Sequence, residues 1–229
     1  MQTNKIIEKM YEVGAHFGLR KSRRHPSMSK FVFNTKNGID IFDLEKTEKV
    51  FSKTLEYIKS LAKENKTILF VGGKKEASAL VREFANKINM PYVSGRFIGG
   101  TLTNFGEIRK RIDKYENLIK EKEVGGLEKY TKKERMLIDK DIERLENMFL
   151  GIVSMKRLPD AILLVDSRRE KNALDEAKVR KIPTIGIMNS DCDFNSVSHQ
   201  IVSNESQRNS IRFILEAITE AYESNKSVK

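Results

Sequence analysis

The stretch TILFVGGKK, residues 67–75, is a short apolar run that stops at two glycines and two lysines. An unbroken run of this length is typical of a strand that is buried on both faces of a parallel sheet. From residue 75 to residue 88 the apolar residues recur every three or four positions, which predicts an amphipathic helix. A strand, a glycine turn and a helix in this order predict one unit of an α/β domain.

Similar units lie on both sides of this stretch. Apolar runs or alternation predict further strands at 39–42, 91–93, 161–165 and 184–188. Helical periodicity predicts further helices at 45–62, 170–179 and 206–223. Because strands and helices alternate along the chain, we predict an α/β fold with a mainly parallel sheet that is flanked by helices.

Residues 105–149 interrupt this alternation. Apolar residues follow steps of 4, 3 and 4 from Ile108 to Ile119 and again from Ile138 to Phe149, with a Gly125-Gly126 turn between the two runs. This pattern predicts a coiled-coil-like helical hairpin inserted into the α/β domain, which then comprises residues 1–104 and 150–229. The narrow apolar seam favours a hairpin that projects from the domain, and a hairpin folded back over the core is the alternative.

The positive charge of the chain is concentrated near its N-terminus. The 229 residues include 43 Lys and Arg against 32 Asp and Glu, a net charge of +11, yet residues 13–39 contain no acidic residue. The six cations of this segment are Arg20, Lys21, Arg23, Arg24, Lys30 and Lys36. Phe17, Phe31 and Phe33 are interleaved with them, and such a mixture suits a phosphate backbone with exposed bases. We therefore predict a nucleic-acid partner, with a solvated basic arm or a targeting signal as the alternatives.

Composition argues against several other function classes. A single cysteine excludes a disulfide framework and a multi-cysteine metal site. Asp191, Cys192 and Asp193 could join His16 at a metal only if the fold brought them together, so we expect no metal and no other cofactor. No apolar run approaches the length of a membrane span, and the N-terminus has no apolar signal region. We expect a cytoplasmic protein without a membrane partner.

The Gly72-Gly73-Lys74 turn raises the possibility of an enzyme. Backbone N–H groups at the start of a helix can hold a phosphate, and Asp166 follows another predicted strand. However, the sequence matches neither the P-loop spacing nor the dinucleotide-binding glycine pattern. A nucleotide-binding α/β enzyme that uses this turn is the alternative hypothesis. Lys74 and Lys75 oppose the helix dipole, which either an RNA phosphate or exposure to solvent would relieve.

The segment GRFIGGTLTNF, residues 95–105, lies between a predicted strand and the hairpin. Its three glycines allow tight backbone paths, Arg96 can bind phosphate, and Thr103 or Asn104 can cap the next helix. The residues alone leave open whether this loop has a structural or a functional role.

This segment also resembles the signature of the bacterial-type small-subunit ribosomal protein two family. Other motifs agree in order along residues 3–222, and they are Gly14–Gly18, Arg23–Met28, Asn37–Ile41, Leu44–Thr47, Ile68–Gly72, Leu158–Ala161 and Lys181–Pro183. The resemblance implies a Rossmann-like or flavodoxin-like fold with a protruding helical hairpin. It also implies a non-catalytic constituent of the small ribosomal subunit, in bacterial cytoplasm rather than in an organelle, with no small-molecule substrate.

The resemblance implies partners and a set of binding residues as well. The partners are 16S-type rRNA and neighbouring small-subunit proteins, including the large mRNA-binding ribosomal protein built of OB-fold repeats. The RNA-binding residues expected from the resemblance and the charge pattern are Arg20, Lys21, Arg23, Arg24, Lys30, Lys36, Lys74, Lys75, Arg96, Thr103, Asn104 and Arg109.

Overall fold

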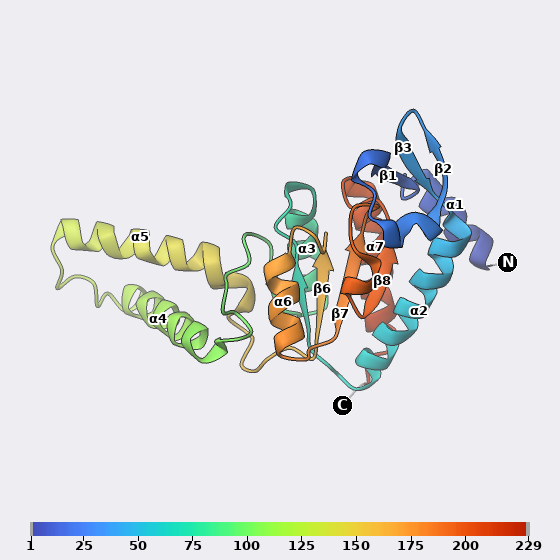
Figure 1. The fold of residues 1–229 in the computed structure, drawn as a ribbon. Coiled ribbons are helices and arrows are strands. Elements are labelled where there is room, and N and C mark those ends of the chain that lie inside the picture. The colour runs from blue at the N-terminus through green and yellow to red at the C-terminus, as the bar shows by residue number, and fades with distance from the viewer. Residues whose placement is uncertain (1, 228–229) are drawn as a thin grey trace.

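A computed structural model of the chain describes residues 2–227. Its main sheet has five parallel strands in the order β5-β4-β6-β7-β8. These strands are β4 (Ile68–Val71), β5 (Tyr92–Val93), β6 (Ala161–Val165), β7 (Thr184–Met188) and β8 (His199–Val202). The parallel sheet with flanking helices confirms the predicted α/β fold, and Figure 1 shows the arrangement of its elements.

Helices cover both faces of this sheet. One face packs against α2 (Leu44–Lys63), α3 (Lys75–Lys87) and α7 (Arg208–Glu223). The other face packs against α6 (Lys171–Val179) and the base of the hairpin. Every residue of β4, β6 and β7 is buried, so the apolar runs that predicted these strands reflect burial on both faces.

The basic N-terminal segment contains a second sheet that the sequence pattern did not reveal. β1 (Phe17–Arg20), β3 (Ile39–Phe42) and β2 (Val32–Lys36) form an antiparallel sheet in the order β1-β3-β2. The strand predicted at 39–42 is therefore present but belongs to this sheet and not to the parallel one. A helix, α1 (Gln2–Glu12), precedes the sheet, and two short 3-10 helices, Lys21–Arg23 and Pro26–Phe31, join β1 to β2.

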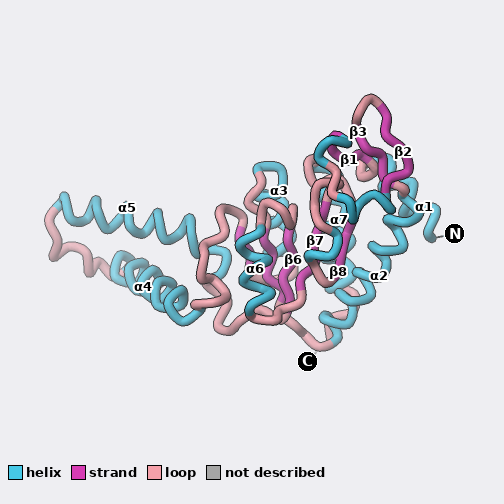
Figure 2. Tube along the Cα trace, in the orientation of Figure 1, coloured by secondary structure: helices cyan, strands magenta, loops and turns pink. Residues whose placement is uncertain are grey.

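The inserted hairpin consists of α4 (Phe105–Glu123) and α5 (Lys132–Phe149). Ile112, Tyr115, Ile142 and Leu145 are buried in its seam, and these residues continue the core on the α6 side of the sheet. The hairpin projects from one end of the α/β domain, whereas the antiparallel sheet lies at the opposite end (Figures 1 and 2). Among the described residues, no helix combines the length and apolarity needed to cross a bilayer.

Candidate nucleic-acid interface

The outer face of the antiparallel sheet presents cations beside apolar side chains. Arg20 and Lys36 both pair in register with Ile39 of the central strand, so the three side chains form one row across the sheet. Both cations are exposed, and Ile39 is 41% exposed. The alternate residues of β3, Asp40 and Phe42, are buried on the inner face. The sheet therefore has one face in the core and one face available to a partner.

Irregular pairing in both edge strands explains why the sequence did not predict them. The register shifts between Phe17 and Arg20 in β1 and between Val32 and Asn34 in β2. Phe33 is the extra residue in β2, and its ring is 76% exposed, while Phe17 is 45% exposed. An extra residue breaks the period of two that would identify a strand, and it redirects a side chain outward. Phe31, the third aromatic residue of the segment, is buried in the core.

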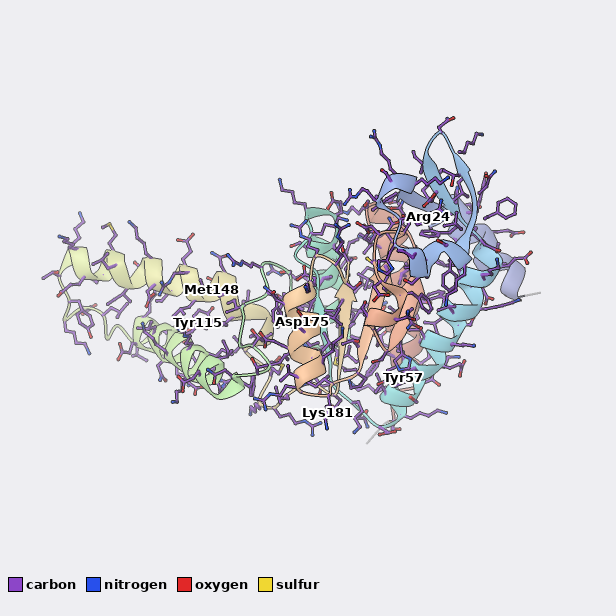
Figure 3. The ribbon with its side chains drawn as sticks, viewed as in Figure 1. Arg24, Tyr57, Tyr115, Met148, Asp175 and Lys181 are labelled. Atoms are coloured by element: carbon purple, nitrogen blue, oxygen red, sulfur yellow. The ribbon has the colours of Figure 1, made fainter. Side chains whose placement is uncertain are left out.

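Arg24 has an internal partner, which corrects the expectation that all six cations of the segment are available to a nucleic acid. Its Nε and Nη2 atoms donate to the two carboxylate oxygens of Asp40 at 2.8 and 2.7 Å. Thr35 also donates to Asp40, at 2.9 Å. Asp40 is fully buried, so this bidentate pair fixes the turn after β1 to the sheet (Figure 3 labels Arg24). The other cations of the segment have exposed side chains.

Lys30 and Arg23 are exposed but anchored. The Lys30 ammonium lies 4.0 Å from the ring centroid of Phe194, and Arg23 donates to Asp191 at 3.2 Å. Both contacts join the N-terminal segment to the chain that follows β7. These contacts hold the cations in defined positions while leaving part of each charged group in contact with solvent.

The Gly72-Gly73-Lys74 turn is filled by acidic side chains of the protein itself. The Gly73 N–H donates to Glu170 Oε1 at 3.0 Å, and Lys74 Nζ donates to Glu205 Oε1 at 2.9 Å and to Asp166 Oδ2 at 3.4 Å. Burial alone would lower the pKa of Lys74, but Glu205 and Asp166 outweigh it and raise that pKa. A Cβ atom at Gly73 would collide with the Gly95 carbonyl oxygen. Carboxylates thus take the place that a nucleotide phosphate would need, which counts against the enzyme hypothesis.

The loop that follows β5 is held by Glu176 of α6. The Glu176 carboxylate accepts from the backbone N–H groups of Gly100, Leu102 and Thr103 at 2.6, 2.9 and 3.0 Å, and from the Thr103 hydroxyl at 3.1 Å. Arg180, one turn further along the chain, donates to the carbonyl oxygens of Leu102 and Thr103. Of the two predicted caps, Asn104 does occupy the N-cap position of α4, but its side chain makes no capping bond there. Thr103 does not cap the helix and donates to Glu176 instead. The backbone N–H groups of the loop converge as they do in an anion-binding site, and the anion that they bind is the Glu176 carboxylate of the protein itself.

The RNA-binding residues predicted from the sequence thus fall into two groups, those with exposed side chains and those whose side chains bond mainly to other residues of the protein. Arg109 resembles Arg24 and Lys74, because it donates to Asp113, Glu116 and the Val153 carbonyl oxygen at 2.8 to 2.9 Å. The predicted residues with exposed side chains are Arg20, Lys21, Arg23, Lys30, Lys36, Lys75, Arg96 and Asn104. Those with mainly internal partners are Arg24, Lys74, Thr103 and Arg109. Sequence reasoning missed Arg168, an exposed arginine that shares Asp191 with Arg23.

No metal centre is formed by the described part of the chain. Within residues 2–227, no three His, Cys, Asp or Glu side chains are grouped as metal ligands would be. Cys192 is buried, and burial raises the pKa of its thiol to about 11, so it is protonated at neutral pH.

The fold and this surface define the class of protein: an α/β domain with a helical arm at one end and an exposed, positively charged antiparallel sheet at the other. A family profile described as "Ribosomal protein S2" matches residues 10–225. The chain is 38% identical over 220 residues to "Small ribosomal subunit protein uS2" of Campylobacter jejuni strain 81-176, covering 96% of this chain and 84% of the relative. The proteins of the same name in Coprothermobacter proteolyticus and Nitratiruptor sp. are each 37% identical, over 94% and 97% of this chain and 80% and 84% of the relatives.

The chain therefore belongs to the ribosomal protein S2 family, as its sequence motifs predicted. It is a structural protein of the small ribosomal subunit and not an enzyme.

Proposed function

We propose that this protein binds 16S-type rRNA through the outward cations of its antiparallel sheet and of the adjoining turns. The observation that carries the proposal is the row of Arg20, Ile39 and Lys36 across the exposed face of that sheet. Lys21 follows Arg20 directly, and no acidic residue interrupts residues 13–39. Cations of this kind neutralise backbone phosphates and release counterions, so affinity falls as salt rises. The rest of the domain acts as a rigid support for this surface.

The internal partners of the other candidates refine the set of residues. Four of the candidates donate their hydrogen bonds to other residues of the protein, and they are Arg24, Lys74, Thr103 and Arg109. We assign these four to support of the interface rather than to contact with RNA. Lys30, Lys75, Arg96 and Asn104 remain candidate contacts because their side chains are exposed. The test of the leading residues, Arg20, Lys21 and Lys36, is the salt dependence of binding to small subunits that have been depleted of this protein.

Phe33 supplies a test of contact with RNA bases. A ring that is 76% exposed contributes little to the core, so Phe33→Ala is expected to leave the urea midpoint of unfolding nearly unchanged. If Phe33 stacks on an unpaired base, the substitution removes about 1–3 kcal/mol of binding free energy. Cosedimentation with depleted small subunits then gives an affinity at least about fivefold weaker. Phe33→Tyr, which keeps a ring, is the control, and equal affinities for the Ala variant and the unsubstituted protein would remove base stacking from the proposal.

We further propose that the projecting hairpin contacts a neighbouring protein of the subunit. Its distal exposed surface carries Val124, Met136 and Leu137, side chains that are at least 51% exposed. Charges of both signs alternate around them, as in the pairs Lys114–Asp141 and Lys122–Asp139, which suits a protein surface better than a phosphate backbone. The mRNA-binding ribosomal protein of OB-fold repeats is the candidate partner that the family resemblance implies.

A shortened hairpin tests the role of the arm. Replacement of residues 118–138 by two glycines removes the distal arm and keeps the buried contacts of Ile112 and Ile142 at its base. We expect the shortened protein to cosediment with depleted small subunits at nearly normal affinity. Quantitative mass spectrometry of the rebuilt particles is expected to show reduced occupancy of one protein, the OB-repeat protein in our proposal. Normal occupancy of every protein would exclude a docking role for the arm, and loss of cosedimentation would instead assign the arm to the main interface.

A further inference from the structure

A pair of arginines outside the antiparallel sheet shares one carboxylate. Arg23 Nη2 donates to Asp191 Oδ2 at 3.2 Å, and Arg168 Nη1 donates to the same oxygen at 2.8 Å. Because both nitrogens contact one atom, the two guanidinium groups lie close together although they are far apart in the sequence. Two positive charges against one negative charge leave an excess of positive charge at this point.

The shared carboxylate is fixed, whereas the guanidinium groups are open. The Asp191 side chain is only 6% exposed, while those of Arg23 and Arg168 are 56% and 58% exposed. Arg168 follows the end of β6, and Asp191 follows the end of β7, its neighbour in the sheet. The Ser190 carbonyl oxygen also accepts from the His25 N–H at 2.8 Å, which ties the N-terminal segment to the same loop. Rigid elements therefore set the spacing of the two arginines before any partner binds.

The pair borders a hollow of about 490 Å³ between the N-terminal segment and α6. Lys171 and Lys178 of α6 also line this hollow. The carboxylates that face it are Asp175, Asp191 and Asp193, so the five basic side chains of the lining outnumber the acidic ones. Arg24 is the fifth basic side chain, and Asp40 already neutralises it. With Arg24 set aside, the four basic side chains Arg23, Arg168, Lys171 and Lys178 face three carboxylates, which leaves an excess of one positive charge.

We propose that Arg23 and Arg168, held in place by Asp191, bind a single backbone phosphate of the rRNA. This inference rests on the proposed RNA-binding function and extends it beyond the antiparallel sheet to the carboxyl ends of the parallel strands. A guanidinium group has several N–H donors in one plane, and each of the two arginines donates to Asp191 from only one nitrogen. The other nitrogens can therefore donate to a phosphate. A carboxylate that fixes two guanidinium groups lowers the cost of ordering them when the phosphate binds. Arg23 lies in the segment without acidic residues, so the phosphate site is continuous with the proposed RNA-binding surface.

The test compares two substitutions that each replace one arginine and therefore remove the same positive charge. Arg168→Ala removes one guanidinium group from the proposed site. Arg212→Ala is the control for the loss of one positive charge, because Arg212 is also paired with a carboxylate, Glu83, but lies on α7, with its side chain 43% exposed. Binding to depleted small subunits is measured by cosedimentation over a series of salt concentrations, and urea unfolding verifies that both variants are folded. A variant with Arg20, Lys21 and Lys36 replaced by Ala is measured beside them as the test of the antiparallel sheet.

The inference is supported if Arg168→Ala weakens binding by about tenfold and reduces the slope of log affinity against log salt by about 0.7–0.9, while Arg212→Ala changes neither. It is overturned if Arg168→Ala behaves like the control while the triple variant still loses affinity, and in that case the proposed RNA-binding function survives. It is also overturned if affinity falls with an unchanged salt slope, because the lost contact is then not a phosphate. If neither the Arg168 variant nor the triple variant loses affinity, both the inference and the proposed function are wrong.

The source of the phosphate is tested separately. Side-chain Nε–H resonances of Arg23 and Arg168 are recorded by NMR as inorganic phosphate or a short single-stranded oligoribonucleotide is added. We expect both resonances to shift at lower concentrations of the oligonucleotide than of inorganic phosphate, because the other cations hold additional phosphates of the chain. A response to inorganic phosphate alone would overturn the assignment to an RNA backbone.

Discussion

Replacement of Glu176 by Ala is expected to lower the free energy of unfolding by about 3 kcal/mol, even though Glu176 is a charged and only half-buried residue of α6. The Glu176 carboxylate accepts four hydrogen bonds from the loop at 100–103, three of them from backbone N–H groups. Each charge-assisted bond of this kind contributes roughly 1.5–3 kcal/mol, and water that enters the loop recovers part of the loss. Because the loop connects the sheet to the hairpin, its release also loosens the base of α4.

Urea unfolding monitored by circular dichroism measures this change. Glu176→Gln keeps one acceptor oxygen and is expected to lose about half as much stability. Glu220→Ala is the matched control, because it removes an exposed glutamate from α7 and is expected to change stability by less than about 0.5 kcal/mol. If Glu176→Ala is as stable as the Glu220 variant, the carboxylate does not hold the loop in solution.

The second large effect is expected in binding, not in stability. Replacement of Arg20, Lys21 and Lys36 by Ala removes three exposed cations from the antiparallel sheet and its adjoining turn. By the counterion-release relation, each lost phosphate contact reduces the slope of log affinity against log salt by about 0.7–0.9, so the total reduction is about 2 to 3. We expect affinity for depleted small subunits at moderate salt to fall on the order of 100-fold.

A second triple variant separates position from net charge. Lys49, Lys53 and Lys63 are exposed lysines of α2, and their replacement by Ala removes the same charge from outside the segment without acidic residues. This control is expected to retain nearly all of the salt slope, because its cations contact no phosphate in our proposal. Equal losses for the two variants would indicate that net charge alone attracts the protein to the particle.

The α/β fold could be predicted because its central strands have a strong signal. β4, β6 and β7 are buried on both faces, so each is an unbroken apolar run. β8 lies at the edge of the sheet, where His199 and Gln200 are partly exposed, and the resulting mixture of polar and apolar residues conceals the strand. β1 and β2 were missed because their register shifts break the alternation of buried and exposed positions.

The functional surface was predictable only in part. Local composition identified the basic segment, because charge density along the chain needs no knowledge of the fold. Which cations face outward depends on partners that are distant in sequence, such as Glu205 for Lys74 and Asp191 for Arg23. The same reason explains the loop at 100–103, since Glu176 lies more than 70 residues away from the N–H groups that it holds. Sequence reasoning therefore identified candidates, and the structure divided them by their contacts.

Ultraviolet crosslinking of intact small subunits, followed by mass spectrometry of nucleotide-bearing peptides, tests the central claim most directly. We expect rRNA crosslinks in peptides from residues 17–39, with Phe33 and its neighbours among the modified positions. Crosslinks found only in the hairpin or elsewhere in the α/β domain, with peptides 17–39 recovered unmodified, would contradict the claim that this sheet faces the RNA.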